Sequence, residues 1–171
     1  SAIEGVPESF ARAYSVMTTE PQGPVYVCYD AALQEDPLTR AIPLPPAGAV
    51  ATPAPMAPDP RAIAAIAEKL LKAEHPLLLA EYAGRRPGGF ADMVELAETA
   101  GAAVWDINSA LNFPNRHPLC LSMDKASLRH TDLVLGLDVR DWEKPLTELN
   151  STKRTLETLV PATCDFAEIG F

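Results

Sequence analysis

The chain has 171 residues, of which 47% are hydrophobic and 22% are charged, so it is long enough for one well-packed domain and hardly long enough for two. Its 14 Lys and Arg against 23 Asp and Glu give a net charge of −9, which disfavours binding to a nucleic-acid backbone. No apolar run approaches the roughly 18 residues that would span a bilayer. We therefore expect neither nucleic acid nor a membrane as a partner.

The cysteines, Cys28, Cys120 and Cys164, lie far apart in the sequence, with no CxxC pair and no His at ligand spacing. This spacing supports neither a zinc site nor a disulfide framework. Reduced thiols in a cytoplasmic protein fit the pattern.

The first part of the chain predicts a helix followed by a strand. In "PESFARAYSVMTTEP", Phe10, Tyr14 and Met17 recur at helical spacing, and Pro7 suits a first helical turn. The β-branched and aromatic run "GPVYVCYD" then predicts a strand, paired with an edge of the following sheet or with a second copy of itself. Residues 36–58 are rich in proline, which predicts an extended linker.

Residues 59–72 carry the strongest helix signal in the chain. Asp59 is placed to cap the helix and Pro60 to occupy its first turn. The expected apolar stripe consists of Ile63, Ile66, Ala67, Leu70 and Leu71.

Short apolar runs alternate with helical patterns from there on. "PLLLAE", "AAVWDIN" and "TDLVLGLD" predict strands, and "GGFADMVELAETAG" between the first two predicts a helix that ends at Gly101. A short helix is expected around residues 125–130, and "CDFAEIGF" alternates as a last strand does. The alternation indicates an α/β fold: residues 59–171 form a Rossmann-like three-layer domain with a mostly parallel sheet, and residues 1–35 are a helix-strand remnant of another domain.

A turn rich in glycine and arginine follows the first of these strands. It holds Gly84, Arg85, Arg86, Gly88 and Gly89. In dinucleotide-binding folds such a turn reads G-x-G-x-x-G and faces a pyrophosphate, and an acidic residue about 20 positions on binds the ribose. Asp106 is placed for that role, but the glycine spacing departs from the motif. The turn either contacts a nucleotide, with help from the arginines, or is a plain strand-to-helix corner.

Three further places are weaker candidates. His117 lies in a loop expected at the carboxyl side of a strand, where a packing role is the alternative. Asp138, Arg140 and Asp141 follow the third strand, where they form either a site or a surface ion-pair cluster. Asp106, with Asn108 and Ser109 after it, suits a helix-capping turn as well as a site.

The order of these motifs resembles the thiamine-diphosphate-dependent enzymes of the acetolactate synthase, benzoylformate decarboxylase and benzaldehyde lyase type. The resemblance is carried by "PQGPVYVCYDAALQE", "IAAIAEKLLKAEHPLLLAEYAG", "ELAETAGAAVWD", "NFPNRHPL" and "TDLVLGLDVRDW". It implies that residues 1–35 end a pyrimidine-binding domain and that residues 59–171 are most of the central Rossmann-like domain. The parent would be a 2-keto acid decarboxylase, another lyase, or a carboligating transferase.

The resemblance also implies which parts lie elsewhere. The family's activating glutamate would precede Ser1, and its GDG motif, which anchors Mg²⁺ and the diphosphate, would follow Phe171; GDG does not occur in the chain. Thiamine diphosphate and Mg²⁺ are thus expected in the parent, the missing domains are expected partners, and the chain alone is expected to be catalytically silent. Parents of this kind form homo-oligomers.

Some relatives bind FAD in the central domain, with an arginine soon after a glycine in the third strand. Gly136 and Arg140 are similar here, although the arginine lies further on. The expected cofactor site, for FAD or ADP, comprises Gly84, Gly88, Gly89, Asp106 and Arg140. A stand-alone flavin- or nucleotide-binding module and a purely structural interaction domain remain the alternatives.

Overall fold

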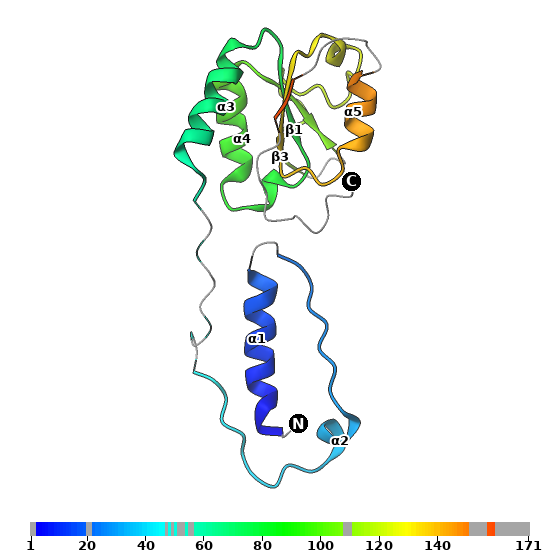
Figure 1. The fold of residues 1–171 in the computed structure, drawn as a ribbon. Helices are drawn as coiled ribbons and strands as arrows, with labels where there is room; N and C mark the ends of the chain where they lie inside the picture. Colours follow the sequence, from blue (N-terminus) through cyan, green and yellow to red (C-terminus); the bar gives the residue numbers. More distant parts are fainter. Residues whose placement is uncertain are drawn as a thin grey trace. The chain divides into compact units, whose positions relative to one another are not determined.

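A computed structural model describes residues 3–19, 22–46, 48, 50, 54, 57–107, 111–150 and 157–159. The chain divides into two compact units, Ser1–Ala57 and Pro58–Phe171. Each unit is described by itself below (Figure 1).

The first unit consists of η1 (Ile3–Gly5), α1 (Val6–Thr18) and the short helix α2 (Ala31–Glu35), joined by extended chain. Its internal contacts are few: the rings of Phe10 and Tyr29 stack with centroids 5.6 Å apart, and the Tyr29 hydroxyl donates to the Val6 carbonyl over 3.5 Å. No side chain is buried among the described residues of this unit. Phe10, Tyr14 and Val16 are each at least half exposed.

The strand predicted in "GPVYVCYD" is wrong for this structure, because residues 22–30 form no strand. Tyr26 is 92% exposed and Val25 is 38% exposed. A strand is stabilised by a neighbour that completes its ladder of hydrogen bonds, and the described part of the first unit contains no other strand to supply one. Pairing with a second copy stays a prediction.

The second unit contains a four-stranded parallel sheet, of which the sequence predicts three strands. Its strands are β1 (Pro76–Ala80), β2 (Ala103–Asp106), β3 (Leu133–Leu137) and β4 (Glu157–Leu159), in the spatial order β2-β1-β3-β4. The central strand β1 pairs Leu77 with Ala103 on one side and with Val134 on the other. All five residues of β1 are buried.

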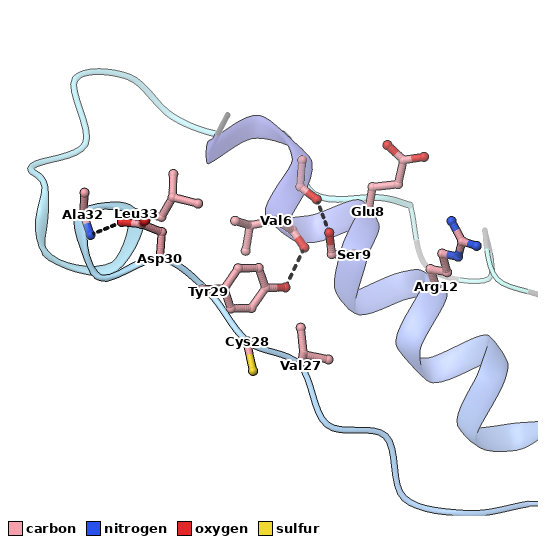
Figure 2. A pocket seen from close by; sticks show the side chains of 11 residues that line it. Val6, Glu8, Ser9, Arg12, Val27, Cys28, Tyr29, Asp30, Ala32 and Leu33 are labelled. Atoms are coloured by element: carbon pink, nitrogen blue, oxygen red, sulfur yellow. Dashed lines mark hydrogen bonds between the residues drawn. The ribbon is translucent and has the colours of Figure 1, made fainter. Parts of the chain in front are cut away.

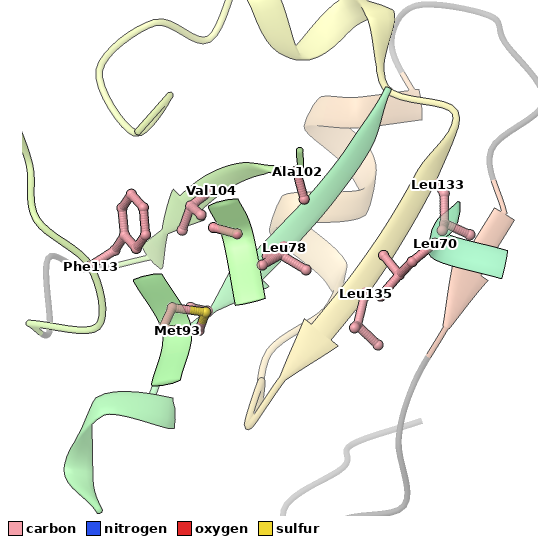
Figure 3. Close-up of a cluster of buried hydrophobic side chains, with 10 residues drawn as sticks. Leu70, Leu78, Met93, Ala102, Val104, Phe113, Leu133 and Leu135 are labelled. Atoms are coloured by element: carbon pink, nitrogen blue, oxygen red, sulfur yellow. The ribbon is translucent and has the colours of Figure 1, made fainter. Parts of the chain in front are cut away.

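Helices cover both faces of this sheet, which confirms the three-layer arrangement (Figure 1). On one face α3 (Pro60–Lys72) and α4 (Gly89–Ala100) pack over Leu78, Val104 and Leu135, with Leu70 and Met93 between the layers (Figure 3). On the other face α5 (Glu143–Asn150) and the 3-10 helix η4 (Ser127–His130) pack over the alternate residues of the strands. This second cluster comprises Leu77, Leu79, Trp105, Leu128, Val134, Val139 and Leu149.

The helix ends follow the sequence signals, but the apolar stripe of α3 is narrower than expected. The Asp59 carboxylate accepts the Arg61 N–H over 2.9 Å at the start of α3, and Gly101 ends α4 with φ of 60°. Leu70 is buried, whereas Ile63 is 50% and Leu71 78% exposed. The predicted stripe is too wide, because only the residues at its centre face the sheet and those at its margins face solvent.

The elements that the sequence analysis does not predict include helix α5 and strand β4. Helix α5 is short and polar, and it begins where the Asp141 carboxylate accepts the Glu143 N–H over 3.1 Å. Strand β4 has only three residues. The predicted last strand "CDFAEIGF" lies outside the described residues, as does Cys164.

Candidate functional site

The place of interest is the edge of the sheet where the carboxyl ends of β1 and β3 meet, and it is called the crevice below. The chain passes from β1 to β2 on one side and then crosses to β3 on the other, so adjacent strands lead into loops that diverge. Ligands of open α/β sheets bind at such a switch point. The two ends are held together by the N–H groups of Glu81 and Tyr82, which donate to the carbonyls of Leu137 and Asp138 over 3.4 and 3.2 Å.

Glu81 and Arg140 form one interaction across this crevice. Glu81 is only 5% exposed, and its Oε2 accepts the backbone N–H of Arg140 over 2.6 Å. The guanidinium of Arg140 lies 4.5 Å from the centre of the Tyr82 ring, within the range of a cation–π interaction. The sequence-predicted Arg140 is therefore at the edge expected for it, but its charge already faces an aromatic ring.

Arg85 and Asp138 form a second interaction across the same crevice. Arg85 ends the 3-10 helix η2 (Ala83–Arg85), which follows β1, and Asp138 directly follows β3. The Arg85 Nε lies 2.8 Å from Asp138 Oδ2, and the two side chains are 26% and 18% exposed. Of the cluster predicted after the third strand, Asp138 and Arg140 lie in the crevice, while Asp141 caps α5.

Hydrogen bonds within the protein engage several N–H groups of the glycine turn. The Gly84 N–H donates to Asn112 Oδ1 over 2.7 Å. The N–H groups of Arg85 and Gly89 donate to the carbonyls of Tyr82 and Arg86 over 3.1 and 3.0 Å. Gly88 has φ of 87° and precedes α4, a conformation that glycine adopts without steric cost. The geometry is that of a tight corner, and the role of the three glycines in ligand binding stays a prediction.

Asp106 lies at the end of β2 and is 8% exposed. Its Oδ1 and Oδ2 accept the side-chain and backbone N–H groups of Asn112 over 2.7 and 3.1 Å. The same Asn112 amide donates to the Glu81 carbonyl over 2.9 Å. Asn112 is fully buried and thus joins the ends of β1 and β2 to the glycine turn. Sequence reasoning missed this residue, although it stands in the quoted motif "NFPNRHPL".

His117 lies away from this crevice. Its Nε2 is 3.3 Å from Glu98 Oε1, near the carboxyl end of α4, and its ring meets Phe113 edge-on at 4.9 Å. Since α4 runs back along the sheet before β2 begins, these contacts place His117 toward the amino ends of the strands. These contacts fit a packing role for His117, which is the alternative to a role in a site.

The described residues contain no cluster of three or more His, Cys, Asp or Glu side chains that could bind a metal. Cys28 and Cys120 are free thiols. Within the same residues, no helix has the length and apolar character needed to cross a membrane.

A separate groove of about 770 Å³ lies in the first unit, between α1 and residues 27–33 (Figure 2). Its lining mixes apolar groups such as Val6, Val27 and Leu33 with the charged groups of Glu8 and Arg12.

Known structures share this fold. No family model and no curated protein matches the chain. A thiamine diphosphate-dependent 4-hydroxybenzoylformate decarboxylase from Rhodococcus jostii RHA1 matches 98% of the chain with a TM-score of 0.64 and 24% identity. Benzoylformate decarboxylase from Polynucleobacter necessarius matches 99% with a TM-score of 0.62 and 23% identity. The chain spans 33% and 36% of those two proteins.

Proposed function

We propose that this chain is the central part of a thiamine-diphosphate-dependent decarboxylase, lyase or carboligase, and that it serves as a scaffold between two cofactor-binding domains. The observation that carries the proposal is the fold match, which runs through both units over nearly the whole chain and yet covers about a third of each neighbour. In the complete protein, thiamine diphosphate would supply the carbanion chemistry and Mg²⁺ would anchor its diphosphate. The residues of this chain would only position the two domains that bind thiamine diphosphate and Mg²⁺.

The first unit supports this proposal independently. Residues 3–46 lack a buried side chain wherever the structure describes them, and a segment of this kind cannot offset its own conformational entropy. We infer that a preceding domain covers the groove along α1 and pairs with residues 24–29. Next to such a domain, residues 24–29 would gain the backbone hydrogen bonds to a neighbouring strand that the predicted strand needs.

The test compares the chain with the full open reading frame that contains it. The chain alone, incubated with thiamine diphosphate, Mg²⁺ and benzoylformate or pyruvate, is expected to release no carbon dioxide above background. The full product is expected to release it with one of these 2-keto acids and to contain a GDG motif after Phe171. Turnover by the chain alone, or a reading frame without that motif, would contradict the proposal.

A second candidate function is binding of an adenine-containing ligand, FAD or ADP, in the crevice between β1 and β3. Two features favour it: the switch-point topology, and the amino end of α4, which follows Gly88 and has no side-chain cap within the described residues. Gly84, Gly88, Gly89, Asp106 and Arg140 would form the site. Thermal shift with FAD, ADP and NAD tests it.

Arg140→Gln should reduce such a shift, whereas Arg129→Gln, which removes the same charge from an exposed position on η4, should leave it unchanged. If millimolar ligand gives no shift in the unaltered chain, the domain acts as a scaffold only.

A further inference from the structure

The Arg85–Asp138 pair joins the segments that follow β1 and β3, at the edge where open α/β sheets accept phosphate groups. Arg85 Nε is 2.8 Å from Asp138 Oδ2, and its Nη2 is 3.4 Å from Oδ1. Both carboxylate oxygens therefore face one guanidinium. This is the two-pronged geometry that an arginine offers equally to a carboxylate and to a phosphate.

The backbone of Asp138 is adapted to this contact. Its φ of 54° lies in the left-handed region, which only glycine, asparagine and aspartate adopt with any frequency. Its carbonyl accepts the Tyr82 N–H over 3.2 Å. The turn after β3 is thus tied to the end of β1 while the carboxylate reaches the arginine that follows β1.

A second cation at this edge, Arg140, is engaged in a different way. The Arg140 guanidinium lies over the Tyr82 ring at 4.5 Å, and the Arg140 N–H donates to buried Glu81 over 2.6 Å. Arg85 and Arg140 are therefore both engaged by groups of the protein itself. A phosphate that is to bind either guanidinium has to replace its present partner.

We propose that Asp138 is an intramolecular latch: its carboxylate occupies the Arg85 guanidinium in place of a phosphate-bearing ligand and keeps the crevice closed to anions. Because a ligand binds only when the pair is open, its apparent affinity is reduced by the fraction of molecules in the open state. The latch goes beyond the proposed adenine site. It applies to any ligand with a phosphate group and does not depend on the chemistry of the parent enzyme.

Asp138→Asn in the full chain tests the latch, since asparagine keeps the shape and tolerates the left-handed backbone but lacks the charge. Titration calorimetry with inorganic pyrophosphate at low salt is expected to show binding about tenfold tighter, or more, than in the unaltered chain, a difference of about 1.4 kcal/mol. Glu95→Gln removes one charge from an exposed position on α4 and should leave the affinity unchanged. ADP, titrated in parallel, separates a phosphate site from one that also contacts adenosine.

The gain should disappear when Arg85→Gln is added to Asp138→Asn. Asp138→Gly serves as a second opening variant if the asparagine variant does not fold, because glycine accepts positive φ without cost. Equal pyrophosphate affinity in the unaltered chain and the opened variants, binding in none of them, or a gain that survives Arg85→Gln would overturn the latch. Failure of the unaltered chain to bind ADP would count against the adenine site but not against the latch.

Discussion

At the scale of single residues, Gly84 shows why a glycine-rich turn is ambiguous in a sequence. A Cβ at this position would lie 2.5 Å from the Leu111 carbonyl oxygen and 3.0 Å from the Asn112 Cα. The turn approaches residues 111–112 so closely that only glycine fits. A phosphate loop needs glycine for the same steric reason, so the letters alone cannot distinguish the two uses.

Gly84→Ala should therefore destabilise the second unit by about 2 kcal/mol, because the new methyl group meets a backbone carbonyl rather than a side chain that can move away. Urea denaturation followed by circular dichroism measures the change. Gly23→Ala is the matched control: an added Cβ there has no atom within 4 Å among the described residues. Equal stability of the two variants would mean that the loop at residues 111–112 yields freely.

At the scale of elements, the predictions that succeeded rest on local signals. Helices α3 and α4 and strands β1 to β3 follow from caps and apolar periodicity within each segment. The strand at residues 24–29 failed because it depends on a partner strand, and α5 was missed because its sequence is short and polar. The predicted order of helices and strands was sufficient to place the candidate site at the carboxyl edge of the sheet. It could not predict the contacts of Arg85 with Asp138 and of Glu81 with Arg140, because these residues lie far apart in the chain and hydrophobic periodicity carries no information about which distant residues meet.

The amino ends of β1 and β3 offer a test that depends on pH. Asp132 Oδ2 and Oδ1 accept the N–H groups of Glu74 and His75 over 2.8 and 2.9 Å. Burial raises the pKa of the Asp132 carboxyl, but the backbone N–H groups of Glu74, His75 and Asp132 itself, together with the charge of His75, outweigh it, so that the folded-state pKa lies below the ordinary value of 3.8. The stability gained from this carboxylate is present above about pH 4 and is lost as the pH falls through the lowered folded pKa.

Asp132→Asn should consequently cost about 1 kcal/mol at pH 7, a figure already reduced for the solvent exposure of the group. At a pH below the lowered folded-state pKa, the variant and the unaltered chain should approach equal stability, because both then carry a neutral side chain. Urea unfolding at the two pH values measures the difference. The same deficit at both would show that the charge on Asp132 contributes nothing.

At the scale of the whole molecule, the two units differ in what stabilises them. Both hydrophobic clusters draw all their members from residues 66–149, on the two faces of one sheet. The described residues of the first unit instead meet through isolated contacts, such as the stacked rings of Phe10 and Tyr29 and the ion pair of Arg40 with Glu4. Exposed ion pairs of this kind add little stability, so cooperative unfolding should belong to the second unit.

Removal of residues 1–57 should accordingly leave the Tm of the remaining chain within about 2 °C of the starting value, because no member of either cluster is lost. Hydrogen exchange of the intact chain should show rapid labelling of residues 22–30, where the structure has no strand, and slow labelling of β1, which is buried throughout. A peptide of residues 1–57 alone should lack a cooperative melting transition, since too little apolar surface is buried to offset chain entropy.

A marked loss of Tm on truncation, or slow exchange across residues 22–30, would mean that the first unit is folded in its own right or against a second copy. Size-exclusion chromatography of both lengths distinguishes those two cases, because association through residues 22–30 requires a dimer that the truncated chain cannot form.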